Sequence, residues 1–168
     1  MTELPKVIFH GSSTPLQAGD FLRPNETFDS DMKRKMTAIF ATPDFDYAKS
    51  FAITSAIRPN GITWIMNKKF ISQKITNPPR AGMKLFVFEL DGDGFALDAR
   101  REYFYPGEKE IIAVHEFDLM DEIKNNGIEF FECDEDFDFG PIGGMTEPEW
   151  QAVFDDGVKN KKFHKINL

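Results

Sequence analysis

The sequence predicts an α+β fold built on a mixed, mainly antiparallel sheet. Three observations carry this expectation. Many short apolar segments of strand length are separated by turn residues, few segments have a helical pattern, and strands and helices do not alternate as they do in βαβ units. The chain also lacks a glycine-rich phosphate loop and any repeat of fixed period, so the common nucleotide-binding sheets and the repeat folds are not expected.

The length and composition suit a single domain over residues 1–168. The chain has 168 residues, of which 41% are hydrophobic, and its 18 phenylalanines can fill a core with rings. The net charge of −8 disfavours a nucleic-acid partner, because such partners are usually met by basic surfaces. The lone Cys133 allows neither an internal disulfide nor a cysteine-rich zinc site, so no metal is expected.

No signal-like or membrane-spanning apolar run occurs in the sequence. The longest apolar segments fall well short of the ~18 residues that a membrane helix needs. We therefore expect a soluble, cytoplasmic protein that makes no membrane contact.

The expected strands are rich in β-branched and aromatic residues and are bounded by glycine, proline and asparagine. A turn at Gly19 and Asp20 precedes a further short extended piece, whereas the polar segment 25–35 and the segment 77–82 are expected to be loops. The segments with a strand pattern are 6–9, 36–42, 61–67, 69–75, 83–92 and 107–117.

Two segments have the pattern of a helix. Residues 43–57 follow Thr42, a candidate N-cap, and carry apolar side chains on one face after an initial proline and two acids. Residues 119–127 form a shorter helix that ends at Gly127. Residues 120–168 are otherwise an unassigned C-terminal part of the same domain.

His10, directly after an apolar strand, and Phe40, near the end of another, are candidate ligand contacts. Gly11 has no Cβ, so a ligand could approach the backbone beside the His10 ring. A histidine that caps a tight turn would give the same local pattern as His10. Phe40 could stack on a planar ligand or simply pack in the core.

Glu108 and Glu110 lie two residues apart, directly after a Pro-Gly turn. In an extended strand they share one face, and such paired carboxylates often mark a site. A solvated charged turn, with Lys109 between the two acids, is the alternative. Neither a metal-ligand spacing nor the Gly-x-Ser-x-Gly motif of acyl hydrolases occurs.

In chain order, "FHGS", "IFATPDFDYAKSFA" and "YPGEKEII" resemble the ADP-ribosyltransferase superfamily, in particular its histidine-tyrosine-glutamate branch. The resemblance implies a split β-sheet core with few flanking helices. It also implies that NAD is the substrate. The implied activity is mono-ADP-ribosyl transfer, in which the nicotinamide-ribose bond is cleaved and ADP-ribose passes to a protein or small-molecule acceptor.

The resemblance also assigns roles to individual residues. His10 would hold the ribose hydroxyls of NAD, Gly11 would bond the nicotinamide amide, and Phe40 would stack on the nicotinamide ring in place of the usual tyrosine. Glu110 would be the catalytic glutamate and Glu108 the first acid of an E-x-E pair. The remaining expected cofactor contacts are Ser12, Thr42 and Tyr47. The candidates for a positive group at the NAD pyrophosphate are Arg23, Lys49 and Arg101.

Two departures from the family pattern stand out. Phenylalanine at position 40 keeps the stacking face but lacks the tyrosine hydroxyl, and E-x-E is more typical of the branch that begins with arginine. Two alternative functions also fit the sequence. One is an NAD glycohydrolase of the same fold, and the other is a non-catalytic, acidic binding or inhibitory module that uses the run "ECDEDFDFG" at 132–140.

Overall fold

The computed structural model describes residues 3–29, 34–61, 63–99 and 102–168. Its fold is α+β, with mostly antiparallel sheets and three α-helices in the described residues. The chain divides into two compact units, each made of two separate segments. The first comprises Met1–Ala56 and Lys84–Phe117, and the second Ile57–Met83 and Asp118–Leu168. The expected single-domain organisation stays a prediction.

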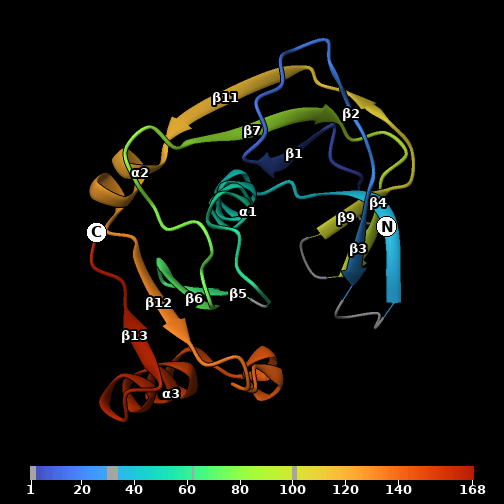
Figure 1. Cartoon of the computed structure of the whole chain (residues 1–168). Coiled ribbons are helices and arrows are strands. Elements are labelled where there is room, and N and C mark those ends of the chain that lie inside the picture. The colour runs from blue at the N-terminus through green and yellow to red at the C-terminus, as the bar shows by residue number, and fades with distance from the viewer. Residues whose placement is uncertain (1–2, 30–33, 62, 100–101) are drawn as a thin grey trace. The chain divides into compact units, whose positions relative to one another are not determined.

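The central sheet of the first unit has the strand order β1-β7-β11 (Figure 1). These strands are β1 (Val7–Ser12), β7 (Lys84–Asp91) and β11 (Ala113–Asp118). β1 runs antiparallel to β7, with His10 opposite Phe88 and Ser12 opposite Phe86. The expected first strand is therefore longer than the segment 6–9, and it continues through the His-Gly pair rather than ending before it.

The other strands of the first unit form a four-stranded sheet and a short two-stranded one. The larger has the order β3-β4-β9-β8, with strands β3 (Asn25–Asp29), β4 (Arg34–Ala41), β8 (Ala96–Ala99) and β9 (Glu102–Tyr105). The smaller pairs β2 (Phe21–Leu22) with β10 (Lys109–Glu110).

The expectation of a loop over 25–35 is wrong, because β3 and the start of β4 are paired there. The polar composition of this segment follows from the position of β3 in its sheet. β3 is the edge strand of its sheet, and natural edge strands carry charged side chains such as Glu26, which pairs with Lys35 at 3.4 Å. Residues 30–33 of this segment lie outside the described residues.

Helix α1 (Phe45–Ile57) begins two residues later than expected, and Thr42 is not its N-cap. The backbone N–H of Tyr47 donates to Asp44 Oδ1 at 3.1 Å, so Asp44 caps the helix. The Thr42 hydroxyl instead accepts from the backbone N–H of Asp44 at 3.1 Å. The proline at 43 fits this arrangement, because it leads the chain from β4 into the cap.

The first unit has an apolar cluster between its strands. Phe86, Phe88 and Leu90 of β7 all point into it, because alternate residues of a strand share a face. The buried members are Ile8, Leu22, Ile39, Ala41, Phe86, Phe88, Leu90, Phe95 and Ile111.

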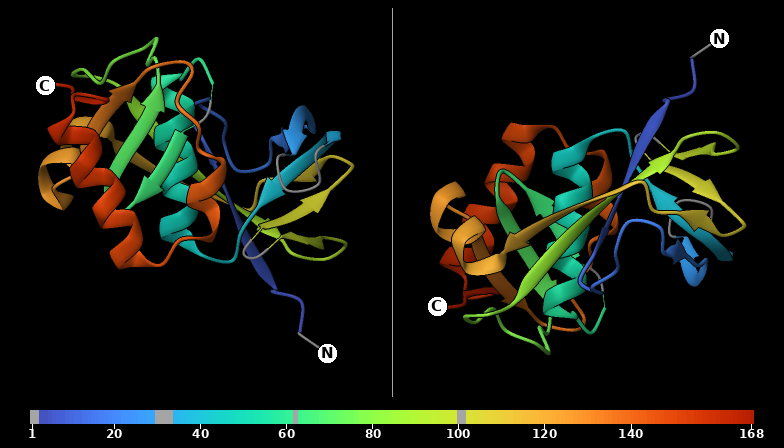
Figure 2. Two further views of the ribbon diagram at one scale, coloured as in Figure 1. Left: turned by 90° about the horizontal axis from the view of Figure 1, so that it is seen from below. Right: turned by 90° about the horizontal axis from the view of Figure 1, so that it is seen from above.

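The second unit is a four-stranded sheet with helices. Its strand order is β13-β12-β6-β5, with one parallel pair, β12 with β6. Figure 2 shows α3 lying along this sheet. The elements are β5 (Thr63–Met66), β6 (Lys69–Gln73), α2 (Leu119–Asn126), β12 (Glu129–Cys133), a 3₁₀ helix η1 (Gly140–Gly144), α3 (Glu147–Lys159) and β13 (Phe163–Lys165).

Several predicted elements are confirmed. The predicted strands 61–67 and 69–75 contain the β5-β6 hairpin, whose two turn residues have φ values of 49° and 64°; residue 62 lies outside the described residues. The predicted strand 83–92 contains β7, and α2 ends at Gly127 with a φ of 65°. The strand expected over 107–117 is divided into β10 and β11. None of the described helices has the length and apolar character needed to cross a membrane.

The acidic run at 132–140 carries two rings, Phe137 and Phe139, that are partly buried. Phe137 and Phe139 pack against the apolar cluster around Trp150, and their rings contact each other at 5.0 Å. β12, which includes the first two residues of the run, is paired on both sides. The use of this run by a binding or inhibitory module stays a prediction.

Candidate active site

The first unit contains an open cleft with a volume of about 670 Å³. β1 contributes His10 and Ser12 to it, and the chain that leads through β2 forms the other wall. The lining residues are His10, Ser12, Thr14, Leu16, Gly19, Asp20, Phe21, Leu22, Arg23 and Asn25. Two of the residues expected to bind cofactor therefore lie at one cleft.

His10 is held in one tautomer by the backbone of β4. Its Nδ1 lies 2.6 Å from the carbonyl oxygen of Phe40, so Nδ1 carries the proton and donates it. Burial lowers the pKa of His10, and the hydrogen bond to Phe40 opposes this only in part. The imidazole is thus neutral at pH 7, and Nε2 is left as a hydrogen-bond acceptor. The ring also stacks over Phe88, with centroids 6.3 Å apart.

Gly11 does not line the cleft, but it lies on β1 between His10 and Ser12, which do. Phe9 exchanges both of its backbone hydrogen bonds with Thr42, at 2.8 and 2.9 Å. In an antiparallel strand alternate residues direct their N–H and C=O groups to the same edge, so those of Gly11 point to the edge where Thr42 lies. β4 ends at Ala41, and the chain after Thr42 turns into α1.

Only glycine fits at position 11, where β1 packs against α1. A Cβ at this position would lie 1.8 Å from the carbonyl oxygen of Ala48 and 2.7 Å from the backbone nitrogen of Ala52. The strand and the helix therefore approach backbone to backbone. This contact fixes the position of the His10 peptide relative to α1.

Glu110 lies on β10, directly opposite Phe21 on β2. Paired residues of an antiparallel ladder share a face, so the Glu110 carboxylate lies on the side of Phe21. Phe21 lines the cleft and is 55% exposed. Glu110 is thus adjacent to a cleft residue but does not itself line the cleft.

Glu108 forms an ion pair with a residue that lines the cleft. Its carboxylate lies 3.3 Å from Nε of Arg23, which lines the cleft. Lys109, between the two acids, is directed elsewhere: its Nζ donates to the carbonyl of Asp93 and lies 4.5 Å from the centroid of the Tyr105 ring. Lys109 therefore does not neutralise the two carboxylates, and Arg23 balances one of them.

Ser12 lies in the cleft, where its Oγ accepts from the backbone N–H of Thr14 at 3.0 Å. The hydroxyl proton is not used in this bond and can be donated to a ligand. The strand end and the following loop are thereby held together at the cleft.

Six of the eight expected site residues do not line this cleft: Gly11, Phe40, Thr42, Tyr47, Glu108 and Glu110. Phe40 contributes its carbonyl oxygen to His10, while its ring is half-buried on β4. Thr42 is almost fully buried and joins β1 to the start of α1. The Tyr47 hydroxyl donates to Glu102 at 3.4 Å, on a different part of the unit.

Phe21 was not predicted to be a site residue, and Arg23 was only one of three candidate cations. The turn at Gly19 and the short extended piece after it were recognisable, but their pairing with the strand of Glu110 joins distant parts of the chain. Of the other candidate cations, Lys49 lies over the Phe117 ring, 4.2 Å from its centroid, and Arg101 is outside the described residues. No group of three or more potential metal ligands occurs in the part of the chain that the structure describes.

Comparisons of the chain with protein-family models, with curated proteins and with solved structures gave no match. The functional argument therefore depends on the geometry of the cleft and on the chemistry of its side chains.

Proposed function

We propose that the chain is an NAD-dependent mono-ADP-ribosyltransferase with an ADP-ribosyltransferase-like fold. The observation that carries this proposal is the state of His10. A neutral imidazole with its Nδ1 proton committed to the Phe40 carbonyl offers Nε2 as an acceptor at the cleft. A ribose hydroxyl is a matching donor.

Groups that line the cleft, and the backbone of Gly11 beside it, suit the remaining parts of NAD. The N–H and C=O of Gly11 can bond the nicotinamide carboxamide, which has both a donor and an acceptor, and the Ser12 hydroxyl can join them. The exposed ring of Phe21 offers a stacking surface for a planar group. Arg23 supplies the positive charge that a pyrophosphate requires.

The proposed reaction breaks the bond between ribose C1″ and the pyridinium nitrogen of NAD. The electron pair of this bond goes to the ring nitrogen, so neutral nicotinamide leaves and positive charge develops on the ribose. Glu110 stabilises this oxocarbenium-like charge electrostatically. A nucleophile of the acceptor then bonds to C1″, and Glu108 takes the proton that the nucleophile releases.

Hydrolysis of NAD is a second candidate function of the same site. Glu108 and Glu110 are both exposed, and the cleft is open, so water can reach the position from which an acceptor would attack. The difference between the two functions is the acceptor, since the bond that breaks is the same.

The test is to incubate the protein with radiolabelled NAD and a bacterial lysate, and to measure nicotinamide, free ADP-ribose and label bound to macromolecules. Glu110→Gln should abolish turnover and leave NAD affinity within about tenfold, because the carboxylate acts on the transition state. Glu102→Gln, on β9, is the control variant for loss of one carboxylate in the same unit. Absence of both nicotinamide release and label transfer in the wild-type protein would reject the proposal.

A further inference from the structure

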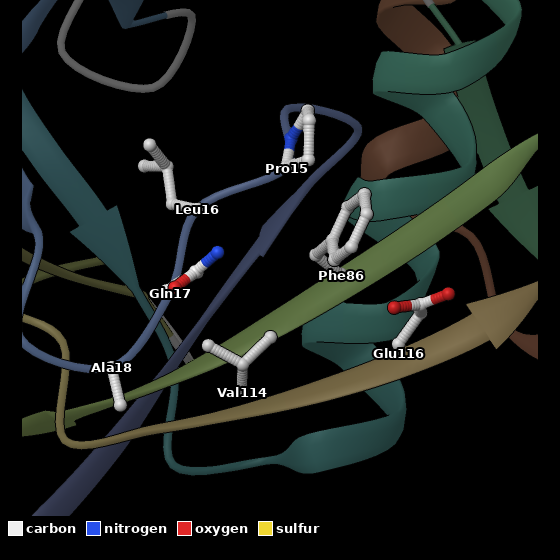
Figure 3. A pocket seen from close by; sticks show the side chains of 7 residues that line it. All are labelled: Pro15, Leu16, Gln17, Ala18, Phe86, Val114 and Glu116. Carbon is white, nitrogen blue, oxygen red and sulfur yellow. The ribbon is translucent and has the colours of Figure 1, made fainter.

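A second hollow lies beside the cleft, in the same unit. Its volume is about 560 Å³, which is within the range of small-molecule sites. Figure 3 shows the loop residues on one side of it and the side chains that rise from β7 and β11 on the other. The lining residues are Pro15, Leu16, Gln17, Ala18, Phe86, Val114 and Glu116.

The hollow and the cleft adjoin each other at two points. Leu16 lines both of them, so its side chain forms a shared wall. Ser12, at the cleft, is the direct cross-strand partner of Phe86, at the hollow. Two molecules bound in these sites would therefore be neighbours that meet beside Leu16.

The chemistry of the hollow selects an amphipathic cation. Leu16, Phe86 and Val114 give it apolar walls, and Glu116 is the one ionisable residue that lines it. The Glu116 carboxylate is 56% exposed and lies 3.6 Å from Nζ of Lys84. Exposed pairs of this kind contribute little, so a ligand cation can take the place of Lys84, whereas an anion would be repelled.

We propose that this hollow binds a small molecule that has an apolar body and one ammonium group. On the transfer function proposed above, on which this part of the assignment rests, that molecule is the acceptor. An ammonium held by Glu116 has no free electron pair, so the attacking group must be at the other end of the molecule, toward Leu16. A hydroxyl there would bond through its oxygen to ribose C1″ and lose its proton to Glu108, as nicotinamide leaves with the electron pair.

Tyramine is a suitable probe, because it has a phenyl body, an ammonium group and a hydroxyl at opposite ends. In the first arm of the test, the full chain without NAD is titrated with tyramine, with 4-ethylphenol, which lacks the ammonium, and with 3-(4-hydroxyphenyl)propionate, which is an anion. Backbone amide NMR spectra report the affinity and the site. We expect tyramine to bind about fivefold more tightly than 4-ethylphenol, the anion to bind most weakly, and the shifted amides to include Gln17 and Val114.

Glu116→Gln should remove the preference for tyramine over 4-ethylphenol. Glu129→Gln, which removes a carboxylate from an exposed ion pair with Lys165 in the other unit, should keep it. Equal affinity for the three probes in the wild-type protein, or shifts that do not include the lining residues, would overturn the inference whatever the result with NAD.

In the second arm, NAD and tyramine are added together and the products are identified by mass spectrometry. We expect an ADP-ribosylated tyramine that keeps its free amine. Nicotinamide release without this product would overturn the acceptor assignment alone. Tyramine binding without any nicotinamide release would instead overturn the proposed transferase function and leave the binding site standing.

Discussion

Gly11→Ala tests the backbone contact that sets the position of the His-Gly pair. The added Cβ would lie 1.8 Å from the carbonyl oxygen of Ala48, whereas real Cβ contacts are not shorter than 3.0 Å. Strand and helix would have to separate by about 1 Å along this direction. The atoms that are met belong to the helix backbone, so no side chain can rotate away to relieve the overlap.

The expected cost is at the upper end of the range for overpacking, about 3 kcal/mol in the free energy of unfolding. Equilibrium unfolding in urea, followed by circular dichroism, measures it. Gly144→Ala is the matched control, since a Cβ there meets nothing within 4 Å and the change should stay within about 0.5 kcal/mol. A stability of Gly11→Ala equal to that of the control would refute the close approach of β1 and α1.

Two further predictions concern ionisable groups. Burial lowers the pKa of His10, so below pH ~6.5 the unfolded chain takes up a proton that the folded chain does not. The free energy of unfolding should therefore decrease as the pH falls from ~6.5 to the pKa of His10 in the folded chain. NAD affinity, measured by calorimetry, should weaken only below pH ~6.5, as Nε2 is protonated. A rise in NAD affinity on acidification would contradict the assigned tautomer. Burial, and next the charge of Asp134, raise the pKa of the Cys133 thiol to about 11, so Ellman's reagent at pH 8 should react rapidly only in urea. Rapid reaction of the native thiol would show that Cys133 is accessible.

Elements whose pattern is local were predictable from the sequence. β7 contains the apolar run LFVF, and α1 carries its signals in adjacent residues: a proline before it, an acid in its first turn and alanines along one face. The end of α2 follows from the left-handed conformation of Gly127. These segments needed no information about their partners in the fold.

β3 and α3 were not predicted, for two different reasons. β3 is a polar edge strand, so its composition is that of a loop, and only its pairing with β4 identifies it. α3 had a usable signal, because the backbone N–H of Thr146 donates to the Glu149 carboxylate at 2.8 Å in a capping box, with Pro148 in the first turn. The sequence "TEPE" carries that signal within four residues.

In the candidate site, too, some residues are predictable from a local pattern and others depend on pairing between distant segments. His10 and Gly11 could be selected because a strand leads directly into them, and Glu110 because it follows a turn with a second acid nearby. The role of Phe21 depends on the pairing of β2 with β10, which joins residues far apart in the chain. The tautomer of His10 likewise depends on a carbonyl of β4 that no local pattern could identify.

The most direct test of the account is a titration of the isotope-labelled full chain with NAD, followed by backbone amide NMR. The account predicts saturable shifts that are largest at Ser12, Phe21 and Arg23, which line the cleft, and at Gly11 beside it. The absence of saturable shifts, or shifts confined to the second unit, would contradict it.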